Sequence, residues 1–283
     1  MANNLDGRVI KGVGGSFSVE TQEGVIVCPA RGLLKRDDDC ILIGDYVELT
    51  KDPTWLITKV YPRKNELVRP PVSNIDVLVV VLASEPKPDY VLLDKMIIAC
   101  YNNNIEPIIC VNKTDISTAV LEYVERVYGD FIKIYSVSAN TGDGIKEFVQ
   151  SLQGTVCFCG QSAVGKTSLL NVITEQNEET GELSRIMRGR NTTRHVSIHR
   201  INSKCELIDT CGFSKLEAGL PDKKEICLYY PDFMKVGECK YRMCQHVREP
   251  ECAIRAAVKK RKIDLKRYYR YLNILGVRNY DED

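Results

Sequence analysis

Two patterns of hydrophobic and polar positions divide this chain at about residue 70. Before that point, apolar residues form short runs of four to six residues, separated by turns that contain glycine. Short runs of this kind, bounded by turn residues, predict β-strands. The predicted strands are residues 7–10, 16–19, 24–28, 44–49 and 55–60. Five strands in this length favour a small barrel of the OB-fold type.

After residue 70 the pattern becomes an alternation of buried strands and amphipathic helices. Residues 75–83 form a continuous apolar run, which is typical of a strand buried on both faces of a sheet. Helix and strand patterns then follow one another at residues 92–100, 107–111, 118–128, 132–137, 145–152 and 155–159. This alternation predicts an α/β domain with a mostly parallel sheet and helices on both faces. Residues 62–71, which contain a Pro-Pro pair, predict a linker between the two parts.

The predicted strand at residues 155–159 leads into a phosphate-loop motif, GQSAVGKTS, and a helical pattern follows it. This strand, loop and helix context is the one in which the motif binds phosphates. Its glycines let the backbone curl so that several N–H groups point at one phosphate, and the helix N-terminus adds its positive dipole end. Lys166 is expected to bridge the β- and γ-phosphates, and the Thr167 hydroxyl to bind Mg²⁺. The predicted phosphate-binding residues are Gly160, Gln161, Ser162, Ala163, Val164, Gly165, Lys166, Thr167 and Ser168.

Two further loops predict which base the site selects. The first, Asn112-Lys113-Thr114-Asp115, follows one predicted strand, and the second, Ser138-Ala139-Asn140, follows the next. A carboxylate at Asp115 can accept from the guanine N1–H and 2-amino groups together. Adenine lacks both donors and would leave the carboxylate unpaired, which costs several kcal/mol. We therefore expect a guanine nucleotide, with Asn112 and Lys113 bracing the base and the phosphate loop, and residues 138–140 near the guanine carbonyl.

Residues 189–213 contain the groups expected around the γ-phosphate. Asp209 ends an apolar strand, where it can hold Mg²⁺ through water, and the Gly212 N–H can meet the γ-phosphate. Thr193, or its neighbour Thr192, can supply a further contact to Mg²⁺ and the γ-phosphate. The segment would then be ordered only when the γ-phosphate is present, which is the behaviour of a switch.

A tight cluster of cysteine and histidine near the C-terminus predicts a metal site. Cys239, Cys244, His246 and Cys252 lie within fourteen residues and form the ligand set of a closed, structural Cys₃His zinc site. The alternative is a group of unrelated cysteines, since the chain has twelve. A closed set leaves no coordination position for a substrate, so structural zinc is expected. The N-terminal residues lack a secretory signal pattern, which indicates reduced thiols and a cytoplasmic protein.

The whole chain carries a formal charge of only +1, but one region is strongly basic. Residues 250–278 hold nine basic residues against two acidic ones, with Tyr268, Tyr269 and Tyr271 among them. Helical spacing at residues 253–258 is expected to leave the basic side chains facing outward. This composition indicates RNA binding, although an ordinary solvated helix has the same pattern. No apolar run approaches the length of a membrane-spanning helix, so no membrane partner is expected.

The motifs resemble those of a guanine-nucleotide-binding domain, but in a permuted order. The phosphate loop usually comes first, whereas here residues 112–115 and 138–140 precede it. Circular permutation is feasible because domain termini lie at the surface and often close together. With the N-terminal β-domain and the Cys₃His spacing, the chain is similar to the ribosome small-subunit-dependent GTPase A family of bacterial assembly factors. The resemblance implies three domains: an OB-like RNA-binding domain (1–69), a circularly permuted GTPase domain (70–220) and a zinc-binding domain with a basic helical tail (221–283).

Two positions around the switch depart from the usual pattern of that family. Cys211 stands where proline is usual, and Asn191 stands where many members have histidine before the Thr-Thr pair. Asparagine can orient a water molecule but cannot act as a base near neutral pH. His195 is nearby and could substitute, although a structural role for its imidazole is the favoured alternative. Phe213 stands where Ras-like proteins place a water-orienting glutamine. The expected catalytic residues are therefore Lys166, Thr193, His195 and Asn191, with slow turnover until a partner orders the switch.

The resemblance also implies a function. It implies a GTPase of late small-subunit maturation, which binds the small ribosomal subunit and its rRNA in the GTP form and is released by hydrolysis. The residues themselves indicate GTP and GDP, magnesium, zinc and RNA contact, and we expect a monomer. Two alternatives stay open: a GTP-dependent RNA-binding switch that does not hydrolyse, and a GTPase acting on a protein or metal-delivery partner, with the basic tail merely solvated.

Overall fold

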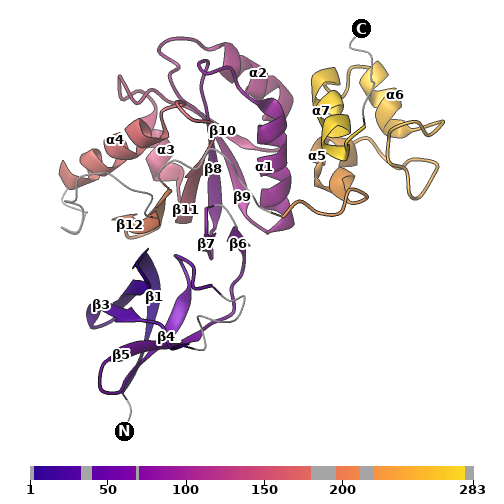
Figure 1. Cartoon of the computed structure of the whole chain (residues 1–283). Helices are drawn as coiled ribbons and strands as arrows, with labels where there is room; N and C mark the ends of the chain where they lie inside the picture. The colour runs from indigo at the N-terminus through magenta and orange to yellow at the C-terminus, as the bar shows by residue number, and fades with distance from the viewer. Residues whose placement is uncertain (1–2, 33–39, 68–69, 180–195, 211–218, 278–283) are drawn as a thin grey trace.

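The computed structural model describes residues 3–32, 40–67, 70–179, 196–210 and 219–277. Three parts follow one another in space as they do along the chain: a β-barrel, a sheet flanked by helices, and a small helical part (Figure 1). Among the described residues, no helix combines the length and the apolar character needed to cross a membrane. The fold class predicted from the hydrophobic pattern is confirmed.

The N-terminal barrel consists of β1 (Asn3–Val13), β2 (Ser16–Thr21), β3 (Gly24–Pro29), β4 (Tyr46–Lys51) and β5 (Trp55–Val60). Antiparallel pairing joins β1 to β2 and β4, β2 to β3, and β4 to β5. A parallel bridge between Ala30 and Ile57 closes the ring, so the strand order is β1-β2-β3-β5-β4-β1. The five predicted strands are therefore present, and they enclose a fully buried core that includes Val9, Val19 and Leu49.

The second part is a mixed sheet made of β8 (Val77–Leu82), β9 (Glu106–Val111), β10 (Lys133–Ser136), β11 (Gly154–Cys159), β12 (Val196–Asn202) and β13 (Cys205–Thr210). The strand order is β10-β9-β8-β11-β13-β12, and all of these strands except β12 are parallel. Every residue of β8 is buried, as its continuous apolar run predicts. The carboxyl ends of the parallel strands consequently meet at one edge, where ligand-binding loops of such sheets gather.

Helices cover both faces of this sheet: α1 (Tyr90–Asn102), α2 (Ala119–Tyr128), α3 (Ile145–Ser151) and α4 (Lys166–Glu179). Residues 78, 80 and 82 of β8 belong to the hydrophobic core that includes α1 and α2. Residues 77, 79 and 81 belong to the core that includes α3 and α4. Since side chains alternate across a strand, this division places one helix pair on each face, as expected.

The sequence pattern does not predict β12, which is the strand that joins the sheet to the barrel. It pairs with β13 on one side and meets β1 on the other, where Lys11 lies opposite Ser197. Its short run of alternating residues carries a weak signal, because strand stability depends mainly on neighbouring strands. The segment predicted as a linker contains a short strand, β6 (Glu66–Leu67), which pairs antiparallel with β7 (Val72–Ser73) just after the segment.

The third part contains a 3₁₀ helix, η2 (Ile226–Tyr229), and the helices α5 (Pro231–Met234), α6 (Ala253–Lys259) and α7 (Leu265–Leu275). Its own core includes Phe233, Ile254 and Tyr271, and this core continues onto Ile98 of α1. In Figure 1, α7 stands alongside α1, and the two helices are in contact. The third part therefore rests on the helical face of the sheet rather than on the barrel.

The basic segment at residues 250–278 is exposed at Lys259 and Lys260, next to the predicted helix, but Arg267 and Arg270 in α7 face inward. Both are buried, with relative exposures of 1% and 8%, and both bind the buried carboxylate of Asp94 in α1. Tyr268 and Tyr271, which lie on the same side of α7, are buried as well. The two arginines hold α7 against α1, so only part of the basic segment is available to a partner.

Candidate functional site

The phosphate loop joins β11 to α4 and has a backbone that requires glycine at two positions. Gly160 has φ of 139°, and a Cβ atom there would lie 2.3 Å from the Val81 carbonyl oxygen. Gly165 has φ of 93°, and a Cβ atom there would lie 2.4 Å from Nδ2 of Asn112. Both values exclude ordinary side chains, because the conformation is left-handed and the space is already filled. The loop is therefore packed tightly against β8 and the Asn112 loop.

Lys166 lies at the first position of α4 and turns back over the loop. Its Nζ donates to the carbonyl oxygens of Gly160 and Gln161, at 2.8 Å and 2.6 Å. Partial burial lowers the pKa of this ammonium group. Val164 anchors the loop in the core, whereas Ser162, Thr167 and Ser168 are exposed. The hydroxyls and the N-terminus of α4 are thus accessible at the carboxyl edge of the sheet. A helix N-terminus favours a bound phosphate at such a place.

Asn112 connects three loops of the site, although only 2% of its surface is exposed. Its Nδ2 donates to the Val164 carbonyl oxygen of the phosphate loop at 3.0 Å. Its Oδ1 accepts from the Ala139 N–H at 3.0 Å. Lys113, held at φ of 63°, reaches the same loop through a 2.8 Å hydrogen bond to the Ala163 carbonyl oxygen. The side chains of this motif therefore position the phosphate loop directly.

A cavity of about 480 Å³ opens between these loops. Its lining residues are Asn112, Lys113, Asp115, Ile116, Ser138, Ala139, Asn140, Gly165 and Ser168. Thr114 stands behind it and donates from Oγ1 to the Val137 carbonyl oxygen at 3.0 Å. The cavity lies next to the phosphate loop and has the size of a pocket for a small molecule or a nucleobase.

Asp115 presents an exposed carboxylate to this cavity. A hydrogen bond with Ser138 lowers the pKa of that carboxyl group, and a bond from Asn140 acts in the same direction. The group is therefore ionised and purely an acceptor near neutral pH. Ser138 Oγ also accepts the N–H groups of Asn140 and Thr141, which keeps the loop turned toward Asp115. Paired donors on a ligand, such as guanine N1–H and N2–H, are the matching partners.

We expect Asp115→Asn to change the base preference of the site from guanine to xanthine. The substitution replaces one acceptor oxygen by an N–H donor, which no longer matches the guanine donors. The affinity ratio of GTP to XTP should fall by about a hundredfold or more, the scale of losing a paired hydrogen-bond site. Competition binding of GTP, XTP and ATP measures this ratio. Asp143→Asn, which changes an exposed carboxylate on the loop that follows β10, is the control and should leave the ratio unchanged. Equal affinity of the parent protein for ATP and GTP would contradict the assignment.

The groups expected around the γ-phosphate are only partly described. Asp209 lies near the end of β13, whose backbone reaches the same edge of the sheet as the phosphate loop. Asn191, Thr193, His195 and Gly212 lie outside the described residues. The predicted magnesium contacts of Thr193 and the predicted catalytic roles of Asn191 and His195 therefore stay predictions.

The cysteine–histidine cluster is brought together in the third part of the fold. Cys239 Sγ lies 3.8 Å from Cys252 Sγ and 3.5 Å from His246 Nδ1, and the Cys252–His246 separation is 3.4 Å. With Cys244, all four ligand atoms lie within 4.8 Å of one another. A tetrahedral zinc ion with Zn–S bonds of about 2.3 Å places its sulfur ligands about 3.8 Å apart. The four side chains can therefore hold one such ion.

Residues around the cluster keep its loop in place, and sequence reasoning did not assign them this role. Glu249 accepts N–H groups of Gln245, Val247 and Arg248 through its carboxylate. Tyr268 donates to the His246 carbonyl oxygen at 2.6 Å, and Tyr271 to that of Gln245 at 2.8 Å. The spacing of these tyrosines, three residues apart on one helix face, is the signal that could have indicated a shared inward role.

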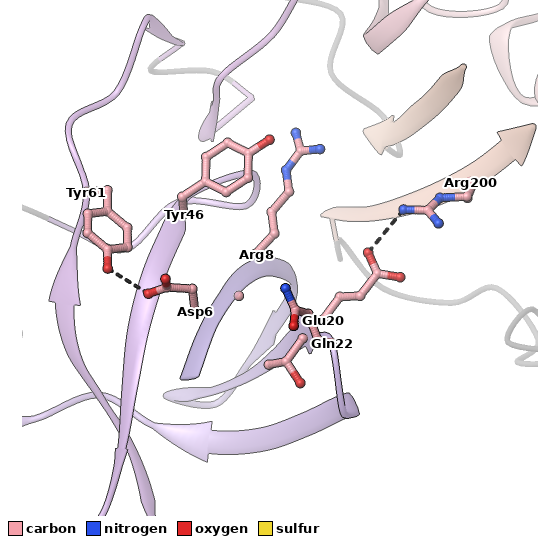
Figure 2. Close-up of a pocket in the computed structure, with 9 residues that line it drawn as sticks. Asp6, Arg8, Glu20, Gln22, Tyr46, Tyr61 and Arg200 are labelled. Atoms are coloured by element: carbon pink, nitrogen blue, oxygen red, sulfur yellow. Dashed lines mark hydrogen bonds and ion pairs between the residues drawn. The ribbon is translucent and has the colours of Figure 1, made fainter. Parts of the chain in front are cut away.

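A second cavity, of about 540 Å³, lies where the barrel meets β12 (Figure 2). Arg8 of β1 donates to Thr155 Oγ1 in β11 at 2.8 Å and forms an ion pair with Glu206 in β13. Across the cavity, Arg200 of β12 reaches Glu20 of β2 at 3.6 Å. Since β11 leads into the phosphate loop and β13 contains Asp209, the contacts of Arg8 join the barrel to the two strands that carry these predicted site residues.

Comparison with known proteins identifies the family. A model of the RsgA GTPase family matches residues 60–219, and a model of the RsgA N-terminal domain matches residues 6–54. The chain belongs to the RsgA family. This membership confirms the resemblance inferred from the permuted motifs, and it covers both the barrel and the sheet.

Similar RsgA proteins match along almost the whole chain. The relative from Caldanaerobacter subterraneus subsp. tengcongensis is 40% identical over 282 residues, with 96% of this chain and 95% of the relative covered. The relative from Alkaliphilus metalliredigens is 36% identical over 283 residues, with coverages of 95% and 96%. Both are named small ribosomal subunit biogenesis GTPase.

Two solved structures have the same fold as this chain. YjeQ from Thermotoga maritima has a TM-score of 0.81 and 29% sequence identity, and the match covers 99% of this chain and 100% of that protein. YloQ, described as a circularly permuted GTPase, has a TM-score of 0.77 and 29% identity, with coverages of 97% and 94%. The permuted order of the nucleotide-binding loops is thus a property that this chain shares with a solved structure.

Proposed function

We propose that this chain is a GTP hydrolase that acts in the biogenesis of the small ribosomal subunit in the cytoplasm. The observation that carries the proposal is Asn112, which joins the phosphate loop to the loop behind Asp115. A guanine in the Asp115 cavity and phosphates at Gly160–Ser168 would be held by one connected set of loops. The names of the RsgA relatives support the ribosomal role.

In this proposal each part of the site has a separate task. Asp115 selects guanine, and residues 138–140 shape the cavity that receives it. The N–H groups of the phosphate loop and the Lys166 ammonium hold the phosphates. Thr167, Asp209 and Thr193 are the residues that would hold Mg²⁺, which supplies charge neutralisation on the phosphate oxygens when bound.

Hydrolysis requires a water molecule to be placed opposite the γ-phosphate. Phe213 follows Gly212 and has no polar group for this purpose. We propose that the free protein hydrolyses GTP slowly, and that docking on the small subunit orders residues 189–195 around the nucleotide. Asn191, His195 or a group of the RNA then positions the water. A non-hydrolysing switch is the second candidate, because neither Asn191 nor Phe213 can act as a base.

In this proposal the other two domains bind RNA, and the zinc site keeps the third domain folded. The barrel (1–69) and the exposed basic residues of the third domain (221–283) bind rRNA on either side of the GTPase domain (70–220). The four clustered ligands hold one structural zinc ion that keeps the third domain folded. No step of the hydrolysis passes through that metal, because the Cys₃His set is closed.

Small subunits should stimulate single-turnover GTP hydrolysis by about a hundredfold or more, since fixing the switch supplies positioning and electrostatic stabilisation of several kcal/mol. Thr193→Ala should remove most of this stimulation and spare GDP binding, because GDP has no γ-phosphate. Phosphate release is measured with small subunits, large subunits or neither. Thr174→Ala, on the outer part of α4, is the control.

Three outcomes distinguish the candidates. Stimulation by small subunits alone supports the proposed enzyme. GTP-dependent binding to small subunits with phosphate release at its basal rate would favour the non-hydrolysing switch. Equal responses to small and large subunits would count against a role specific to the small subunit.

A further inference from the structure

A groove of about 720 Å³ separates α7 of the third domain from the start of α1. Lys87, Pro88 and Tyr90 line one wall, and Lys266, Tyr269 and Asn273 line the other. The groove is outside the GTP cavity, and nothing in the proposed hydrolysis uses it. Its volume lies in the range of about 300–1,000 Å³ that is usual for pockets of small organic ligands and cofactors.

The charges in this groove are positive and accessible. Lys87 and Lys266 are exposed, one on each wall, and no ion pair involving either is found in the described part of the chain. Asp89 is the nearby acid, and its carboxylate caps α1 by accepting the Leu92 N–H at 2.9 Å. Exposed basic residues at 259–262 lead up to Lys266. The groove therefore has an exposed positive charge on each of its two walls.

Aromatic rings accompany these cations. Tyr90 and Tyr269 are half-buried residues on opposite walls, so each ring is fixed yet partly accessible. Arg270 also lines the groove, with its guanidinium 5.5 Å from the Tyr90 ring centre and its Nε bound to Asp94. Because Arg270 is anchored in this way, the two walls are held at a set separation rather than collapsing together.

We propose that this groove binds a single-stranded segment of RNA. Unpaired bases stack on tyrosine rings, and lysines on both sides neutralise the backbone phosphates, which is the chemistry of single-strand binding. A membrane surface or a flat duplex cannot reach rings recessed between two helices. The proposal rests on the proposed function for the source of the RNA, which is the small ribosomal subunit.

The groove is also connected to the nucleotide site. The segment before α1 forms one wall, and Gln161 of the phosphate loop binds it twice, accepting from the Asp89 N–H at 2.9 Å and donating to the Lys87 carbonyl oxygen at 3.3 Å. Lys113 donates to the Glu85 carbonyl oxygen of the same segment at 2.8 Å. RNA on this wall would therefore contact the backbone that supports both loops of the GTP site.

The test uses the full chain with Lys266→Ala and Tyr269→Leu, and measures binding to small subunits in the presence of a non-hydrolysable GTP analogue. Tyr269→Leu should weaken binding about tenfold, the scale of one stacked base. Lys266→Ala should weaken binding several-fold. It should also make the fall of log affinity with log salt less steep, by roughly 0.7, because one phosphate contact is lost. Tyr269→Phe keeps the aromatic ring and should bind small subunits like the parent. Lys146→Ala removes a lysine on the opposite face of the sheet, and it should also bind like the parent. All four variants should keep the basal GTP hydrolysis rate.

Ultraviolet cross-linking of the same complexes, followed by peptide mapping, should attach RNA to the peptide that contains Tyr269. Unchanged binding of both variants would overturn the proposal and leave the ribosomal function standing. Loss of binding together with cross-links from this peptide to a ribosomal protein would assign the groove to a protein partner. If the parent itself does not bind small subunits, the proposed function fails. The groove is then tested by measuring the affinity for a single-stranded oligouridylate, which the parent should bind about tenfold more tightly than the Tyr269→Leu variant.

Discussion

Cys244→Ala should unfold the third domain while leaving GTP binding intact. Cys244 is one of the four clustered ligands, and it is also buried in the core with Phe233 and Tyr271. Binding of structural zinc contributes about 10–16 kcal/mol in small zinc-binding peptides, so a domain of this size depends on it for folding. Elemental analysis should give about one zinc per parent chain and much less for the variant.

Hydrogen exchange separates the domains in this experiment. Amides of residues 221–277 should lose protection in Cys244→Ala, whereas those of the sheet should keep most of theirs. Treating the parent protein with a strong chelator should have the same effect. Cys227→Ala is the matched control, because this half-buried thiol lies in the same core but outside the cluster. A variant that loses GTP binding and keeps a folded third domain would show that the site has been misassigned.

Asp94→Ala should have the second-largest effect, by separating α7 from the sheet. The Asp94 carboxylate is 1% exposed and accepts from Arg267 Nη1 and Arg270 Nε, both at 2.5 Å, and from Tyr128. Burial opposes the charge on these guanidinium groups, but the neighbouring carboxylates outweigh it and raise their pKa values. Removing Asp94 leaves buried positive charge without its partner, which costs about 3–5 kcal/mol.

Urea unfolding and hydrogen exchange of α7 measure this loss. Asp130→Asn is a suitable control, because the Lys235–Asp130 pair is 3.9 Å long and Asp130 is 91% exposed. Its effect should stay below about 1 kcal/mol, as for other surface pairs. Asp232→Asn should lie between the two, since Arg267 would keep Asp94 as its partner. If Asp94→Ala unfolds like the parent, the interface is held by its apolar contacts, and the buried ion pairs add nothing measurable.

The two predictions together define what α1 does. Its middle binds the third domain through Asp94, and the segment before it is hydrogen-bonded to Gln161 and Lys113 of the GTP site. The helix and the segment before it thus contact both the third domain and the loops at residues 112–115 and 160–168. Asp94→Ala is therefore also expected to weaken any response of GTP hydrolysis to ligands of the third domain, because the connection between them is lost.

The sequence by itself determined the fold class, the permuted order of the nucleotide loops and the composition of the metal cluster. Each of these features is local: the phosphate loop, the Asn112–Asp115 loop and the Cys₃His set are short motifs whose spacing is constrained by their own ligand. Residues 75–83 likewise identify a central strand, because a strand covered on both faces must be apolar throughout.

Only the tertiary structure decided how these features are joined. The pattern at residues 196–202 is too weak to predict β12, whose pairing with β1 and β13 connects the barrel to the sheet that carries the phosphate loop. Helical spacing could not show that Arg267 and Arg270 point inward, because their partner Asp94 lies on another helix, more than 170 residues away along the chain. A basic residue on a helix can be buried only where a carboxylate lies close enough to form an ion pair with it. The fold brings that carboxylate into place, so the local sequence pattern does not predict the pair.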